Sequence, residues 1–103
     1  MAQFIFHYRM GNNPPKPEQG EQLKAKWQQW IEDLGDAVVA PSTPTKNSKT
    51  VSLEGVTDTK DDMPLCGYTI IEAADMDAAL EIAKSCPHLY VGNLEVAEQI
   101  KMG

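Results

Sequence analysis

The segment at residues 3–9 most constrains the fold, because apolar and polar character alternates along it with a period of two. Three aromatic side chains fall on one side of the extended chain: Phe4, Phe6 and Tyr8. The other side carries Ile5, His7 and Arg9. This spacing predicts a β-strand that begins almost at residue 1. If its aromatic face packs on the helices, His7 and Arg9 point to the opposite side.

A helical pattern follows a loop at residues 11–15, whose two prolines interrupt strand and helix alike. Pro17 suits the first turn of a helix, and Gly35 suits a C-terminal cap. Between them lies one apolar stripe: Leu23, Trp27, Trp30, Ile31 and Leu34. Its spacing of three and four residues predicts a helix, and we interpret Trp27 and Trp30 as core residues rather than a ligand platform.

The remaining segments are shorter. Strands are predicted at residues 36–40, 49–53, 67–73 and 94–100, from β-branched or alternating patterns bounded by turn residues. Residues 41–48 and 56–64 read as loops, the second exposed and rich in aspartate. Asp75 can cap a second helix, which ends at Pro87.

The predicted order is β-α-β-β-β-α-β. Without the short strand at residues 49–53 it is the split β-α-β, ferredoxin-like arrangement, an α+β fold with two helices on one face of an antiparallel sheet. The other face of such a sheet is bare and here would carry apolar residues. We therefore expect a homodimer that packs sheet against sheet.

The charge balance excludes some partners. The 103 residues include 9 Lys+Arg and 15 Asp+Glu, a net charge of −6, which argues against nucleic acid and anionic membranes. Residues 51–103 hold 10 acidic against 3 basic side chains, whereas residues 1–50 are near neutral. The length fits one domain spanning residues 1–103.

Compartment and cofactors are also constrained. No stretch is long and apolar enough to span a bilayer, and the N-terminus lacks the pattern of a secretory signal. We therefore expect a cytoplasmic protein in which Cys66 and Cys86 are free thiols. No nucleotide fingerprint is present, and the spacing of His7, His88 and Cys86 does not support a metal site, so we expect neither cofactor nor metal.

The downstream half carries a family pattern. A Gly-Tyr strand at residues 67–73 ends in Glu-Ala, an Asp-Met-Asp-Ala-Ala-Leu helix follows, and Cys86-Pro87-His88 comes next. Residues 92–96 then read Gly-Asn-Leu-Glu-Val. The sequence resembles the YCII-related (DGPF-domain) family, although its residues 54–56 lack the Pro-Phe of the family's loop.

The resemblance implies a ferredoxin-like protomer that dimerises into an α/β barrel, with a pocket between the sheet and the surrounding loops. Some family members are thought to use a His–Asp pair for proton transfer or elimination chemistry on small molecules. The matching positions here hold Lys24 and Cys86, so this chain departs from that pair.

Candidate chemistry lies on the polar face of the first strand. His7 and Arg9 could converge with Glu72 or Glu95 in the barrel interior, where burial and pairing would shift their pKa values toward working pH. The alternative is a cross-strand pair between Arg9 and one of the two glutamates, with His7 simply packed.

His88 and Tyr90 follow the second helix. His88 is either a base or a partner of the terminal helix carbonyls, and Tyr90 either lines the same pocket or anchors the loop.

Two functions remain open. We expect a non-catalytic ligand-binding or regulatory module with a small-molecule pocket; the alternative is an acid–base enzyme, similar to an isomerase or lyase, acting on a small anionic or aromatic molecule. The candidate catalytic residues are His7, His88 and Glu72, and the candidate ligand-binding residues are Arg9, Tyr90 and Lys24.

Overall fold

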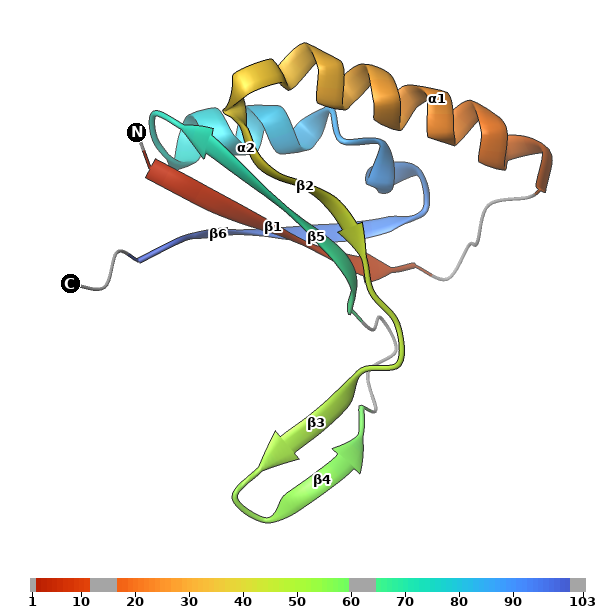
Figure 1. Ribbon diagram of the computed structural model, residues 1–103, viewed down its shortest axis with the longest axis vertical. Helices are drawn as coiled ribbons and strands as arrows, with labels where there is room; N and C mark the ends of the chain where they lie inside the picture. The colour runs from red at the N-terminus through yellow and green to blue at the C-terminus, as the bar shows by residue number, and fades with distance from the viewer. Residues whose placement is uncertain (1, 12–16, 60–64, 101–103) are drawn as a thin grey trace.

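The structure is a computed structural model that describes residues 2–11, 17–59 and 65–100 (Figure 1). In chain order the elements are β1 (Ala2–Met10), α1 (Pro17–Leu34), η1 (Gly35–Ala37), β2 (Val38–Pro44), β3 (Lys49–Ser52), β4 (Gly55–Asp58), β5 (Leu65–Ala73), α2 (Met76–Lys84), η2 (Pro87–Tyr90) and β6 (Gly92–Glu98). Predictions for residues 12–15 and 60–64 lie outside the described residues.

Four strands form one antiparallel sheet in the order β2-β5-β1-β6. Both helices cover the same face of this sheet (Figure 1), and the opposite face carries no helix among the described elements. The chain therefore has the ferredoxin-like α+β fold that its pattern predicts.

The core forms where the aromatic face of β1 meets the helices. Phe4 and Phe6 are fully buried, and Tyr8 retains only 4% of its exposure. Strand β5 adds Thr69 and Ile71 on the same side, and Trp30 of α1 packs over Phe6 with ring centroids 6.2 Å apart. The period-two prediction for β1 is confirmed.

Local signals fix the helix ends. Asp75 caps α2, because its Oδ1 accepts a hydrogen bond of 2.8 Å from the backbone N–H of Ala78. Gly35 follows α1 with φ +54°, a conformation that favours glycine. None of the described helices is long and apolar enough to cross a membrane.

The predicted end of the second strand is wrong. We expected a strand at residues 36–40 and a loop from Pro41, whereas β2 runs from Val38 to Pro44. Among the described strands β2 lies at the edge and pairs with β5 alone, so a proline without an N–H removes no bond from a second neighbour. The last strand likewise lies two residues earlier than predicted, at Gly92–Glu98.

The exposed loop predicted from residue 56 begins as a strand. β4 pairs with β3 in a two-stranded hairpin, joined by the turn at Leu53 and Glu54. Figure 1 shows this hairpin projecting away from the helices, past the uncovered face of the main sheet. The alternation that makes β4 a strand is only four residues long, too short to separate from loop sequence.

Replacing the buried Phe6 tests this core. Phe6→Ala leaves a cavity beneath Trp30 and should lower the free energy of unfolding by about 3–5 kcal/mol. Ile100→Ala, at a side chain that is 80% exposed, should change it by less than about 0.5 kcal/mol. Urea denaturation followed by circular dichroism measures both; equal losses in the two variants would contradict the assigned core.

Candidate functional site

A small pocket opens on the helix-covered side of the sheet, near the C-terminal end of β1. Its volume is about 220 Å³. The lining residues come from β1, α1, β2, β5 and η2: Tyr8, Trp27, Ser42, Thr43, Pro44, Cys66, Gly67 and His88. Five elements that are far apart in sequence therefore build one site.

Hydrogen bonds hold the Tyr8 hydroxyl at the pocket wall. Tyr8 Oη and Thr69 Oγ1 share a hydrogen bond of 2.5 Å, and Thr69 Oγ1 lies 2.8 Å from Ser42 Oγ. On the other side the Cys86 thiol donates to Tyr8 Oη at 3.8 Å. Because Thr69 is fully buried, this chain of hydroxyls is fixed within the fold.

Burial keeps these groups neutral. Burial, with a smaller contribution from the neighbouring Cys86, raises the pKa of Tyr8 well above its ordinary value of about 10. The hydrogen bonds from Thr69 and Ser42 oppose this shift without cancelling it. Burial also raises the pKa of the Cys86 and Cys66 thiols. At neutral pH the Tyr8 phenol and the Cys66 thiol, which line the pocket, are therefore uncharged, as is the Cys86 thiol that contacts Tyr8.

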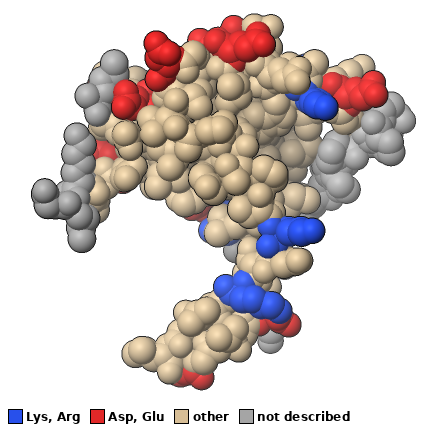
Figure 2. Space-filling model, viewed as in Figure 1, with Lys and Arg blue, Asp and Glu red and all other residues tan. Residues whose placement is uncertain are grey.

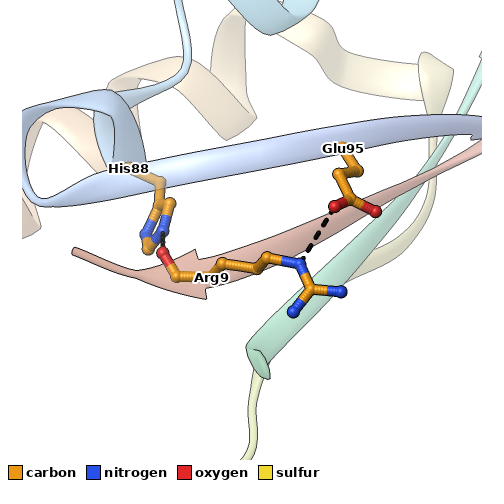
Figure 3. A network of polar contacts seen from close by, with 3 residues as sticks. All are labelled: Arg9, His88 and Glu95. Carbon is orange, nitrogen blue, oxygen red and sulfur yellow. Dashed lines mark hydrogen bonds and ion pairs between the residues drawn. The ribbon is translucent and has the colours of Figure 1, made fainter. Parts of the chain in front are cut away.

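His88 is held by the backbone of β1. Its Nε2 lies 2.8 Å from the carbonyl oxygen of Arg9, as Figure 3 shows. A carbonyl only accepts, so Nε2 donates this hydrogen bond, and when the ring is neutral Nδ1 is the nitrogen without a proton. The ring packs on Tyr8 with centroids 4.9 Å apart, and His88 is only 6% exposed.

This contact depends on the absence of a side chain at Gly92. A Cβ there would lie 2.2 Å from the Arg9 carbonyl oxygen and 2.9 Å from His88 Nε2. Glycine therefore allows β6 to approach β1 closely enough for the histidine to reach that carbonyl.

The predicted acid–base cluster forms only in part. His7 projects from the uncovered face of the sheet, in register with Tyr68 and Glu95, whereas His88 lies on the helix-covered face. Glu72 is in register with Gln3, four residues from His7 and therefore about 13 Å along the strand. Strand register therefore brings His7 and Arg9 together with Glu95, and keeps Glu72 and His88 apart from them.

Arg9 is engaged on the uncovered face. Its Nε donates to Glu95 Oε1 at 3.0 Å, and the two residues lie on neighbouring strands (Figure 3). The structure thus has the cross-strand pair considered as the alternative, formed with Glu95. Arg9 contributes its backbone carbonyl, but not its side chain, to the residues around the pocket.

Tyr90 and Lys24 also lie outside the pocket. Tyr90 is 68% exposed, and its hydroxyl accepts a hydrogen bond of 3.3 Å from Lys26 Nζ, which also lies 4.3 Å from the ring centroid. This contact anchors the η2 segment to α1. Lys24 is exposed on the same helix.

The sequence interpretation missed most of the pocket. Trp27 was interpreted as core, and it does pack against Tyr8, edge to face at 5.4 Å, but it also lines the pocket. Thr69 offered a signal, because it is the polar residue on the buried face of β5, and a buried hydroxyl requires a partner. Ser42 gave no such signal, since it lies in the segment predicted as loop.

The fold and the pocket define a small ferredoxin-like α+β protein with an aromatic-walled cavity beneath its first helix. No family model matches the sequence, and no curated protein matches it significantly.

A solved structure does share the fold: 5-chloro-2-hydroxyhydroquinone dehydrochlorinase (TftG) from Burkholderia phenoliruptrix AC1100, in complex with 2,5-dihydroxybenzoquinone. The alignment has a TM-score of 0.61 and covers 98% of this chain and 95% of that chain, at 17% sequence identity. At this identity the likeness shows the fold.

The raised pKa of Tyr8 predicts a pH dependence of stability. The unfolded chain loses the phenolic proton near pH 10, whereas folded Tyr8 keeps it to higher pH. The free energy of unfolding should therefore fall as pH rises above about 10, by up to about 1.4 kcal/mol per pH unit for this proton. Tyr8→Phe has no proton to lose, so its unfolding free energy, measured with urea at several pH values, should decline less steeply. Parallel declines would contradict the assignment.

Proposed function

We propose that this protein binds a small planar ring molecule in the pocket beneath α1. One observation carries the proposal: the rings of Tyr8, Trp27 and His88 surround a single pocket of about 220 Å³. A cavity of about 150 Å³ already accommodates benzene. The pocket therefore suits one substituted six-membered ring.

The polar groups favour a ring that carries oxygen substituents. Ser42, Thr43 and the neutral phenol of Tyr8 supply hydroxyls, and His88 supplies an imidazole, among apolar lining groups. Such a distribution, apolar walls with a few placed polar groups, is typical of ligand sites. The complex of TftG with 2,5-dihydroxybenzoquinone, in the same fold, supports a hydroxylated quinone or hydroquinone as the ligand class.

Calorimetric titration with 2,5-dihydroxybenzoquinone tests this proposal. Trp27→Leu removes an aromatic wall of the pocket and should weaken binding about tenfold or more. Tyr90→Leu is the matched control, since Tyr90 is an aromatic residue outside the pocket, and should leave the Kd within about twofold. Absence of binding by the unmodified protein, or equal effects of the two variants, would refute the proposed site.

Acid–base catalysis in the same pocket is the second candidate function. The observation that favours it is the contact of His88 Nε2 with the Arg9 carbonyl, because this contact leaves Nδ1 of the neutral ring free of a proton and able to act as a base. His88 would accept a proton from a ring hydroxyl of the substrate. The activity named for TftG, dehydrochlorination of a chlorinated hydroxyhydroquinone, is compatible with this role.

The two histidines of the chain provide a matched pair of variants for this function. Chloride release from 5-chloro-2-hydroxyhydroquinone should fall about 100-fold or more in His88→Gln, because general-base catalysis contributes at least that factor. His7→Gln, on the opposite face of the sheet, should keep the rate within about twofold. No release above the uncatalysed rate, or full activity of His88→Gln, would leave ligand binding alone as the function.

We also propose that the protein works as a homodimer of the YCII-related family. The uncovered face carries an apolar row that crosses all four strands in register: Ala40, Ile70, Ile5 and Ala97. Packing this face on a second copy would remove the row from water. The free thiols of Cys66 and Cys86 fit the reducing cytoplasm.

A further inference from the structure

The hairpin of β3 and β4, which we call the arm (residues 49–58), is the least covered part of the described chain. Every residue of its two strands is exposed. Val51 and Val56 retain 74% and 66% of their exposure, and Leu53 at the turn is fully exposed. An isolated two-stranded hairpin is marginally stable in water, so the arm needs a surface to pack on.

The arm has one apolar face. Val51 and Val56 are directly opposite each other, so both side chains lie on the same face, with the ion pair of Lys49 and Asp58 beyond them. The other face is hydroxylated and carries the directly opposed pair Thr50 and Thr57. This difference marks the valine face as the one that requires a cover.

The chain is more extended than a compact domain of its length. Its extents are 47 × 42 × 19 Å and its radius of gyration is 14.9 Å, against about 13 Å for a compact domain of this length. The accessible surface is 7506 Å², about 1,700 Å² more than a compact monomer of 11.4 kDa exposes. A stable dimer buries about 800 Å² on each partner, so the excess exceeds what one interface needs.

Position and charge favour a second copy of this chain as the cover. Figures 1 and 2 show the arm projecting past the uncovered sheet face, leaving a concave space between arm and body. Each arm strand is about 13 Å long, whereas sheets packed face to face lie roughly 10 Å apart. The arm is therefore long enough to reach past the sheet face onto a second copy. Most of the acidic side chains visible in Figure 2 lie over the helical layer, and basic side chains lie where the arm joins the body, which limits repulsion between two chains of net charge −6.

The geometry points to the arm as a clasp, in which the valine face of each protomer's arm packs against the flank of the other protomer. A two-fold axis through the stacked sheets places both arms in equivalent positions, so one symmetric contact covers both. This inference rests on the proposed homodimer and adds a second contact region to it, outside the sheet face.

Sedimentation velocity of matched double variants tests the clasp. V51D/V56D places charge on the apolar face and should raise the dimer dissociation constant about 30-fold or more. T50D/T57D adds the same charge at directly opposed positions on the other face, so it reproduces any repulsion within the hairpin, and should change the constant less than about threefold. Circular dichroism should show the same fold in both.

The outcomes separate the clasp from the proposals on which it rests. A dimer that is unaffected by V51D/V56D, or weakened equally by both variants, overturns the clasp and leaves the sheet-face dimer standing. If the unmodified protein is monomeric at about 100 μM, a concentration at which even weakly associating proteins form dimers, both the clasp and the sheet-face dimer are wrong. Ligand binding in the pocket is measured independently by the calorimetric titration, so its failure is distinguishable from either result.

Discussion

The packing of the aromatic face of β1 against α1 is the contact on which the rest of the structure depends. Phe6 packs on Trp30 and Tyr8 packs on Trp27, so one pair of elements supplies the centre of the core and then the wall of the pocket. Along the buried face of β1 the phenyl rings of Phe4 and Phe6 are followed by the phenol of Tyr8, which carries a hydroxyl. That change at Tyr8 marks the point where the core ends and the candidate site begins.

The two faces of the sheet consequently have different tasks. On the covered face, Tyr8, Thr69 and Ser42 are tied together by hydrogen bonds and remain uncharged, which suits recognition of a neutral or weakly acidic ring. On the uncovered face, Arg9 and Glu95 pair beside an apolar row, which suits packing on another protein surface. Arg9 belongs to both, since its carbonyl positions His88 and its side chain faces the other way (Figure 3).

Much of the fold was predictable because its signals are local. The alternation at Phe4, Phe6 and Tyr8, the apolar stripe of α1 and the cap at Asp75 each act within one element, and all three are confirmed. The extension of β2 through Pro41 was not predictable in this way, since an edge position is a property of the assembled sheet.

The site was less predictable, because register decides it. Sequence alternation placed His7 and Glu72 on one sheet face, but only the pairing of β1 with β5 sets Glu72 four rows from His7. His88 depends on a contact with Arg9 across 79 positions of sequence, and on the small size of Gly92. No local sequence pattern could have predicted that His88 reaches the backbone of Arg9.

The most direct measurement of the central claim uses the two indole N–H signals in nuclear magnetic resonance spectra. Trp27 lines the pocket, whereas the indole of Trp30 lies outside it and donates a hydrogen bond of 3.1 Å to Ser85 Oγ at the end of α2. Adding 2,5-dihydroxybenzoquinone should move the Trp27 signal to saturation and leave the Trp30 signal nearly unchanged. A fixed Trp27 signal, with shifts confined to residues of the uncovered face such as His7, would contradict the account.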